Sequence, residues 1–478
     1  MSQSSGGMIA VILSSSLLAG CAMAPATPPE STIAVPDQVT GSGIVRSGAP
    51  PARWWHLYRE PALDSLIEEA LANNRDLRAA SAHLLQARSV LDEARGERWP
   101  ATGLSAGAGG GSTIQDQIAA ASERSDAIRT GPRFDLGLDV SWELDLFGRL
   151  RSAIAAAKAD AQASEALEQG VRVAVAAGVT GAWLDACSYA HRADVARHSL
   201  ELARRGRDLA EKLLAAGSGL PADILRADAL VAQAGADVPP LEARRHGALT
   251  ELAVLTGHPP TEIPAAAQSC HAVPPIDDLL PVGDGAALLR RRPDVREAEY
   301  RLAAATARIG VAMADLYPRI SLDGGAAISS PSIGGLAGRD NLVWRVGPFL
   351  TWSFPNMTAA RIRIASAQAG EAAALAEFDG TILRALKEVD QAAETYGASL
   401  RRQEDLHAAA DRSAHADRLM QLQRSAGAAT ALEALDAERA DSAAQEAFAA
   451  AAGDVAAAGV ALFKTLGGGW EDAAGRVP

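Results

Sequence analysis

Hydrophobic residues follow two different periods along the chain, and the shorter period marks strands. Between Arg133 and Trp142 every second residue from Phe134 onward is apolar, and the intervening residues are charged, polar or small. The same alternation occurs in 320–328 and 344–354. Period two predicts strands with one apolar face, and about ten residues is the length that crosses a bilayer at a tilt. We expect strands at about 101–110, 133–146, 319–329 and 343–354.

Long stretches without proline predict helices. No proline occurs in 62–99, in 133–220 or in 356–477, and proline is the strongest helix breaker. Each half of the chain should therefore hold a helix of about 35 residues, a non-helical stretch, a helix of nearly 70, and a returning helix of about 35. The long helices are expected at 149–216 and 357–425, and Pro239-Pro240 should kink the first returning helix. At 1.5 Å per residue each long helix extends roughly 100 Å, which indicates a rod, a coiled coil or a tube.

The chain is an internal repeat. Residues 70–78 match 288–296 at an offset of 218, and the offset falls to 210 farther on, so eight residues are lost between the two registers. The matched pairs are Pro100 with Pro318, Trp142 with Trp352, and Gly217 with Gly427. The domains are then a first repeat at 51–258, a linker at 259–283, a second repeat at 284–466 and a tail at 467–478.

Four strands are too few for a membrane barrel. A barrel needs at least about eight strands, and open sheet edges are not tolerated in lipid. The strands form either a soluble hairpin packed on a helix or part of a barrel that several copies of the chain share. Their membrane-spanning length favours the shared barrel.

The N-terminus resembles a lipoprotein signal. Residues 8–19 are apolar but too short to span a bilayer, and they lead into Leu18-Ala19-Gly20-Cys21, which resembles a bacterial lipobox. We expect a signal peptide at 1–20, a covalent lipid on Cys21 and a tether at 21–50. Ala22, in place of Asp, favours the outer membrane. Residues 1–7 carry no Lys or Arg, which departs from the usual signal; an ordinary apolar N-terminus is the alternative.

Composition excludes several functions. The chain has 478 residues, with 45 Lys and Arg against 58 Asp and Glu, and no basic cluster that would bind nucleic acid. Apolar residues make up 48% but aromatics only 4%, which favours closely packed helices. No apolar window of 18 residues occurs, so a multi-span helical membrane protein is excluded. No catalytic motif is present, and we expect no enzyme activity.

Several motifs resemble one family. Trp54-Trp55, Ser141–Arg151, Leu289–Val295 and Ile309–Pro318 are similar to segments of the TolC-type outer-membrane efflux proteins, in particular the NodT-like lipoprotein subgroup. The likeness runs from Trp54 to about Leu466. It implies a mainly α, two-repeat TolC-like fold: a homotrimer in which three times four strands form a 12-stranded β-barrel on an α-helical tunnel in the periplasm.

The resemblance also implies a function and partners. Such a protein passively conducts substrates from an inner-membrane transporter and a periplasmic adaptor to the exterior, with no cofactor besides the lipid on Cys21. A duct for secreted polypeptides and a periplasmic coiled-coil scaffold without a barrel are the alternatives. Amphipathic strands argue against the scaffold.

The periplasmic end of such a channel is its gate. The helix pairs should turn at Gly217, Gly219 and Gly427, because tight turns need positive φ. Carboxylates near the turns would form rings in a trimer and select cations. Just after Gly427, where relatives carry Asp, this chain has Ala429. The acidic residues nearest to the turns, Asp223, Glu433 and Asp436, are therefore the candidates for the gate, with Arg424 as a latch partner. Alternatively, each is a solvated helix-surface charge.

The remaining polar and sulfur residues give weaker signals. Cys187 and His191 share a helix face, with His198 one further heptad along, but a metal site needs more converging ligands, and we expect none. Cys187 and Cys270 form a disulfide or stay as two free thiols, and we expect free thiols. The run 290–292 of three Arg should be a solvated helix start.

Overall fold

The computed structural model describes residues 27–35, 51, 53–112, 114–124, 128, 130–276, 289–338 and 342–467. The predicted signal peptide at 1–20, the predicted lipid site Cys21, most of the predicted tether at 21–50 and the tail beyond 467 lie outside them. The chain divides into two compact units. The strand unit contains Met1–Ser31, Leu85–Ala163 and Ala298–Glu377, and the turn unit contains Thr32–Leu84, Ser164–Glu297 and Phe378–Pro478.

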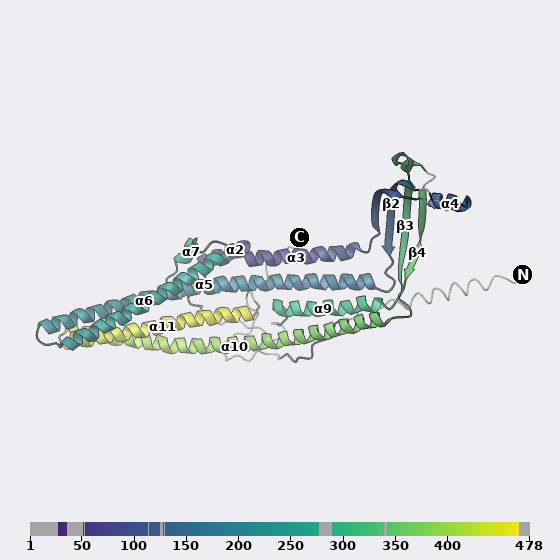
Figure 1. Cartoon of the computed structure of the whole chain (residues 1–478). Coiled ribbons are helices and arrows are strands. Elements are labelled where there is room, and N and C mark those ends of the chain that lie inside the picture. The colour runs from purple at the N-terminus through teal and green to yellow at the C-terminus, as the bar shows by residue number, and fades with distance from the viewer. Residues whose placement is uncertain are drawn as a thin grey trace. The chain divides into compact units, whose positions relative to one another are not determined.

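The strand unit holds one antiparallel sheet in the order β1-β2-β3-β4 (Figure 1). The strands are β1 (Ala101–Gly111), β2 (Gly131–Glu143), β3 (Arg319–Ser330) and β4 (Leu342–Thr351), with α4 (Ile114–Ser122) between the first two and η2 (Ile333–Ala337) between the last two. β2 ends at Glu143, before the predicted 146, because the next residues turn to cap a helix. β4 likewise ends at Thr351 rather than 354.

The first predicted helix of 35 residues is wrong, because it is two helices. α2 (Pro61–Asn73) and α3 (Arg75–Gly96) are separated at Asn74, whose Oδ1 accepts the N–H of Leu77 at 3.0 Å. A side-chain acceptor of this kind competes with the helical hydrogen bonds and starts a new helix. In the second half, α9 (Pro293–Ala314) begins directly after Arg292, which is not helical.

The long helices are continuous. α5 (Arg149–Ala215) has 67 residues and α10 (Thr358–Ser425) has 68, and α6 (Pro221–Leu255) and α11 (Ala431–Thr465) return from them. α6 continues through Pro239 and Pro240 without a break in the helix. By length and composition α5 and α11 each contain a stretch apolar enough to cross a membrane, but 72% of that stretch in α5 is buried against other elements, as in a core helix.

The core of the turn unit combines a few aromatic rings with many alanines. Trp54 of η1 (Trp54–Tyr58) stacks on Phe463 of α11, with ring centroids 4.6 Å apart. Glycines let the helices approach: a Cβ on Gly453 would clash with the side chain of Ser188. The Ala-rich composition thus serves close helix packing.

Two sequence-based predictions are wrong here. Cys187 and Cys270 form a disulfide with Cα atoms 4.9 Å apart, because the linker, which includes α7 (Ala265–Gln268), folds back onto α5. The bridge also removes the Cys187 thiolate as a metal ligand. Arg292 is not solvated but 7% exposed. Its guanidinium binds Asp294 at 2.8 Å and Glu388 at 2.7 Å, so its charge is compensated.

Candidate functional site

The strand register gives the sheet one mainly apolar face, without a charged residue in its central rows. Leu104, Leu138, Ala326 and Trp344 lie in one row across the four strands. The rows two residues away on the same face hold Thr102, Val140, Gly324 and Val346 on one side, and Ala106, Leu136, Ile328 and Leu342 on the other. The side chain of Trp344 is 70% exposed, and several of its neighbours are similarly uncovered. A large uncovered apolar face of this kind fits lipid or another protein surface.

The opposite face of the same sheet carries the charges. In the row Gly103, Asp139, Gly325 and Arg345, Arg345 pairs with Asp139 at 3.5 Å. The pair lies across Gly325, where a Cβ would come within 2.9 Å of the Asp139 carboxylate.

A second carboxylate on this face, Asp323, accepts hydrogen bonds from the hydroxyls of Ser141 at 2.6 Å and Ser321 at 2.9 Å. Arg133 and Asp135 form a further ion pair at 2.8 Å. The sheet therefore separates an apolar side from a hydrated, charged side.

Both edges of the sheet are open among the described strands. β1 pairs only with β2, and β4 pairs only with β3. The main-chain groups along the outer edges of β1 and β4 are free to pair with a strand of another chain, and an open edge of this length demands such a partner or a cover.

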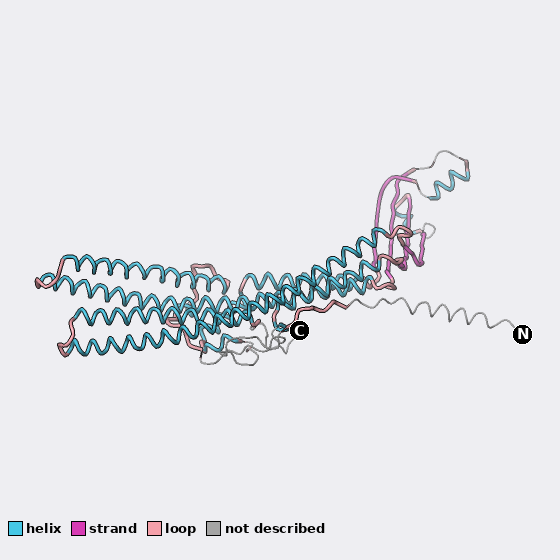
Figure 2. The backbone as a smooth tube through the Cα atoms, turned by 90° about the horizontal axis from the view of Figure 1, so that it is seen from below, coloured by secondary structure: helices cyan, strands magenta, loops and turns pink. Residues whose placement is uncertain are grey.

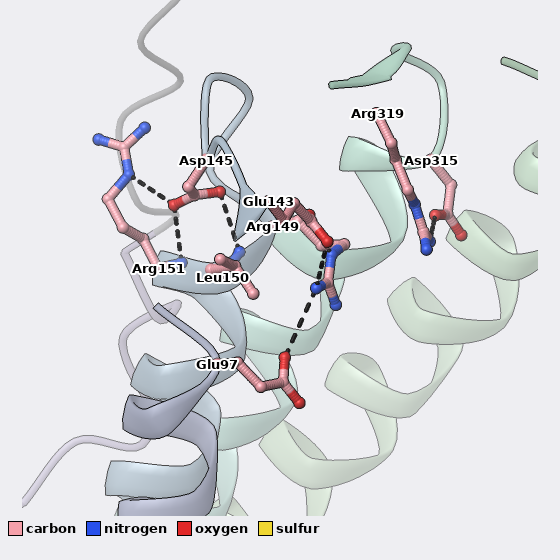
Figure 3. A network of polar contacts seen from close by, with 8 residues as sticks. All are labelled: Glu97, Glu143, Asp145, Arg149, Leu150, Arg151, Asp315 and Arg319. Atoms are coloured by element: carbon pink, nitrogen blue, oxygen red, sulfur yellow. Dashed lines mark hydrogen bonds and ion pairs between the residues drawn. The ribbon is translucent and has the colours of Figure 1, made fainter. Parts of the chain in front are cut away.

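A network of charged side chains fixes the junction between β2 and α5 (Figure 3). Asp145 accepts the N–H groups of Leu150 and Arg151, both at 3.0 Å, which satisfies the free donors of the first turn of α5. The guanidinium of Arg149 binds both carboxylate oxygens of Glu143, at 2.7 and 2.8 Å, and contacts Glu97 at 3.5 Å.

Two tryptophans hold the strand ends in the same way in both halves. The indole N–H of Trp142 donates to the carbonyl of Arg98 at 2.8 Å, and that of Trp352 donates to Leu316 at 3.2 Å. Phe147 stacks on Tyr317 with centroids 4.7 Å apart. The motif 141–151 is thus the element that joins sheet to helix.

In each half a short loop joins the long helix to the returning helix (Figure 2), and the two loops have similar backbone geometry. Gly217 and Gly427 have φ of 75° and 76°, as a left-handed C-terminal cap requires. The N–H of the following residue bonds five residues back in each turn, Ser218 to Leu213 and Ala428 to Gln423. Gly219 has no positive φ, but a Cβ there would lie 2.8 Å from the nitrogen of Leu214.

Asp223 and Glu433 occupy the same position in the first turn of the returning helices. Glu433 accepts the N–H of Thr430 at 2.7 Å, and Thr430 Oγ1 accepts the N–H of Glu433 at 3.2 Å, which is a complete capping box. Asp223 accepts the N–H of Leu220 at 3.1 Å, but leucine offers no acceptor in return. Backbone and hydroxyl hydrogen bonds from Thr430 hold the pKa of Glu433 below its usual value.

The other two gate candidates have local surroundings. Asp436 lies 3.5 Å from Arg439 on its own helix, and Arg424 lies in the last turn of α10. The sequence analysis missed a different pair of contacts. Arg205 of α5 binds Glu438 of α11 at 2.5 Å, and Arg207 of α5 binds Asp228 of α6 at 2.7 Å.

The repeat held a signal for these contacts. Asp228 and Glu438 are equivalent at the offset of 210, so an acid recurs at one site in both returning helices. Their arginine partners, Arg205 and Arg207, both lie on α5 and do not occupy equivalent positions in the two repeats. Each acid meets its arginine only because α5 packs against both returning helices.

Comparison with known proteins places these features in one family. The model of the outer membrane efflux protein family matches residues 66–258 and 286–468. Outer membrane protein OprJ of Pseudomonas aeruginosa is 31% identical over 97% of this chain and 96% of its own length, and Nodulation protein T of Rhizobium leguminosarum bv. viciae is 27% identical over 95% and 92%.

A solved structure agrees. The outer-membrane channel OprN is similar with a TM-score of 0.81 and 34% identity, covering 93% of this chain and 99% of that one. The two-repeat fold, the sheet with one lipid-compatible face and the capped helix turns are therefore features of a TolC-like channel, and the chain belongs to the outer membrane efflux protein family.

Proposed function

We propose that this protein is the outer-membrane channel of a tripartite efflux system, which passively conducts substrates delivered by an inner-membrane transporter and a periplasmic adaptor. The observation that carries the proposal is the sheet with one apolar face, one charged face and two open edges. Family membership and relatives with efflux names, such as the toluene efflux pump outer membrane protein TtgF of Pseudomonas putida, support it.

The open edges support a trimer. If β1 of one copy pairs with β4 of the next, three copies of the four-stranded sheet close a barrel of twelve strands, above the minimum of about eight. Closure leaves no edge, puts the apolar rows against lipid, and turns Asp139, Asp323 and Arg345 toward a water-filled lumen. The charged face then gives substrates a polar path through the membrane.

The turn unit supports a gate at the helix turns. Arg205–Glu438 joins a helix of the first half to a helix of the second, whereas Arg207–Asp228 joins two helices of the same half. Opening would break the first contact and keep the second, as α10 and α11 move away from α5. Three copies of Asp223 and Glu433 would form acidic rings at the constriction.

The anchor and the partners complete the proposal. The resemblance of Leu18–Cys21 to a lipobox supports a covalent lipid on Cys21, which would hold the N-terminus in the outer membrane while the helices extend into the periplasm. The adaptor and transporter supply the energy and the substrate choice, so this chain catalyses no reaction.

The test starts from the detergent-extracted protein. Native mass should give three chains, and negative-stain images should show a tube well over 100 Å long, since each long helix alone extends roughly that far. In planar bilayers the sample should form discrete channels that favour cations. A soluble monomer or an elongated dimer without channels would contradict the proposal and favour a scaffold.

The lipid anchor needs its own variant. Replacing Cys21 with Ser should abolish incorporation of labelled palmitate and leave the trimer and its channels intact. Palmitate incorporation into Cys21→Ser would show that the lipid lies elsewhere.

A further inference from the structure

We propose that β4 of one copy pairs with β1 of the next copy in one fixed register, which places Trp352 opposite Leu104 and Phe349 opposite Gly107. The inference rests on the proposed closed trimer and goes beyond it, because closure alone does not say which residues meet. The partner of each open edge is a second copy of this chain, and the internal repeat specifies how the two edges align.

The two hairpins of the sheet obey the repeat residue by residue. β3 follows β1 at the offset of 218, and β4 follows β2 at the offset of 210. In the first hairpin Ala101 pairs with Ser141. The equivalents of these two residues, Arg319 and Thr351, pair with each other in the second hairpin. The two halves therefore present the same strand geometry, so a contact from the first half to the second should recur from the second half to the first.

The contact between β2 and β3 is the one that recurs between copies. β2 is the last strand of the first half, and β3 is the first strand of the second half. The equivalent contact joins β4 to β1, which lie at opposite edges of the sheet, so β1 must come from another copy. A contact of this head-to-tail kind closes a ring of identical subunits. Since Trp142 pairs with Leu322 inside the chain, Trp352 pairs with Leu104 of the next copy.

This register keeps both faces of the sheet continuous across the joint. Leu104 lies on the mainly apolar face, and Trp352, directly after β4, continues the alternation that puts Trp344 on that face. Leu350 then lies opposite Ala106, which is on the same face. A slip of one residue in either direction would put the apolar face of β4 beside the charged face of β1, which a lipid-facing sheet does not tolerate.

The exposure of equivalent residues agrees with a missing neighbour at each edge. Leu322 on the inner strand β3 is 40% exposed, whereas its equivalent Leu104 on the edge strand β1 is 77% exposed. Leu136 on the inner strand β2 is 39% exposed, and its equivalent Val346 on the edge strand β4 is 67% exposed. A strand from the next copy would supply the cover that the inner strands already have.

Gly107 has a role in this register that it does not have within one chain. At its equivalent, Gly325, an added Cβ would come within 2.9 Å of the Asp139 carboxylate, so the glycine leaves room for the residue opposite. At Gly107 an added Cβ would meet only the Cβ of Asp135, at 4.0 Å. No contact among the described residues therefore requires a glycine here. The register places Phe349, the equivalent of Asp139, opposite Gly107 of the next copy.

Phe349 is an exposed aromatic residue on the charged face. It lies in one row with Ser321 and Glu143, and it is 60% exposed. An aromatic ring that lies over a glycine of the facing strand covers apolar surface and stabilises the pair of strands. The ring of Phe349 and the missing side chain of Gly107 thus complement each other across the joint.

The test links the two strands through cysteine pairs in the full-length protein, oxidised with copper phenanthroline after extraction in detergent. Ser105→Cys with Thr351→Cys lies in the proposed register. Gly103→Cys with Thr351→Cys, and Ser105→Cys with Ser353→Cys, represent slips of two residues in either direction. We expect covalent trimers on non-reducing gels mainly from the first pair, because a disulfide needs Cβ atoms about 4 Å apart and diagonal neighbours are about 7 Å apart. The single variants control for links through the native cysteines.

Native mass of the same samples separates the register from the trimer itself. Three chains with the strongest link in a slipped pair, or with no link in any pair, would overturn the register and leave the proposed channel standing. A monomer without links in any pair would overturn both, since no neighbouring strand would exist.

Two glycines of β1 test the contact with the ring. Gly107→Val should lower the temperature at which the extracted trimer dissociates in sodium dodecyl sulfate, because the added side chain meets Phe349 of the next copy. Gly109→Val is the control and should not, because the register places it opposite Gly347, and no described atom lies within 4 Å of an added Cβ there. In the Phe349→Ala background Gly107→Val should cost little, whereas a clash inside the chain would persist. Equal effects of the two valines, or an unchanged cost in that background, would overturn the contact.

Discussion

The guanidinium of Arg292 donates to the main-chain carbonyl of Thr465 at 3.0 Å. In the other half, Asn74 makes the equivalent contact: its side-chain amide donates to the carbonyl of Leu255 at 2.9 Å. The donors are equivalent at the offset of 218 and the acceptors at 210. In each half, therefore, the break after the first helical stretch is tied to the last turn of the returning helix, and one architectural contact is made by two different side chains.

Replacing Arg292 with Ala should lower the free energy of unfolding by about 2–4 kcal/mol, because Thr465, Asp294 and Glu388 lose their shared donor. Burial lowers the pKa of Arg292, but the hydrogen bonds to Asp294 and Glu388 together raise it by more, so its pKa lies above the usual value. The group that the substitution removes is therefore a permanent positive charge. Guanidinium unfolding of the detergent-solubilised protein measures the change. The exposed neighbour Arg290→Ala is the control and should change stability by less than about 0.5 kcal/mol. Equal effects would contradict the role of Arg292.

Replacing Cys270 with Ser should lower stability by about 2–4 kcal/mol, because the bridge closes a long loop and constrains the unfolded chain. The bridged residues are 83 apart in sequence. When a thiol reductant is added to the oxidised protein, its unfolding midpoint should fall to the midpoint of the variant. The variant itself should not respond to the reductant. A reductant-sensitive variant would mean that another thiol is involved.

Replacing Gly427 with Ala should cost about 1–2 kcal/mol, because its φ of 76° is unfavourable for any residue with a Cβ. No atom lies within 4 Å of the added Cβ, so the cost is conformational rather than steric. Gly247→Ala is the matched control: its surroundings are equally open, but it lies inside α6. That change should stabilise the protein by up to about 1 kcal/mol. Denaturant unfolding of both variants measures these changes: the free energy of unfolding should fall for Gly427→Ala and rise for Gly247→Ala.

Replacing Glu433 with Gln separates charge from capping. Glutamine keeps the hydrogen bond of a capping box, so the unfolding midpoint should stay nearly unchanged, whereas cation preference should decrease. Reversal potentials across planar bilayers with unequal salt measure the preference. Unchanged reversal potentials would exclude Glu433 from the constriction ring.

The same ring should depend on pH. Hydrogen bonds from Thr430 lower the pKa of Glu433 from its ordinary 4.5, so its stabilising and selective contribution is fully present above 4.5 and is lost only as the pH falls through the lowered value. The cation preference contributed by Glu433 should therefore persist at pH 4.5 and decrease at lower pH. Glu433→Gln should lack this step. A step above pH 5 in the unmodified channel would contradict the assignment.

Replacing Arg205 with Ala should raise the resting conductance of single channels, because it removes the contact between α5 and α11. The stability cost should stay below about 1 kcal/mol, since the side chain of Arg205 is 55% exposed. Arg204→Ala, an exposed neighbour on the same helix, is the control and should leave conductance unchanged. A double-mutant cycle with Glu438→Gln should show that the two effects are not additive.

Local patterns in the sequence determine much of this protein. Period-two alternation reveals strands such as β2, and the absence of proline reveals α5 and α10. The repeat reveals that Gly217 and Gly427 lie in equivalent turns of the two halves. These features depend on interactions between near neighbours in the chain, and the signal is therefore local.

Contacts between distant segments were decided only by the tertiary structure. Whether Cys270 reaches Cys187, whether Arg292 is solvated, and which arginine meets Glu438 all depend on how the linker and the returning helices pack. A single sequence specifies a residue's period and propensity, but a buried charge or a bridge depends on the partner that folding brings within a few ångströms. The predictions of free thiols and of a solvated Arg292 failed because such a distant partner fixes the state of these residues, whereas the first helix is interrupted by a local acceptor, Asn74 Oδ1.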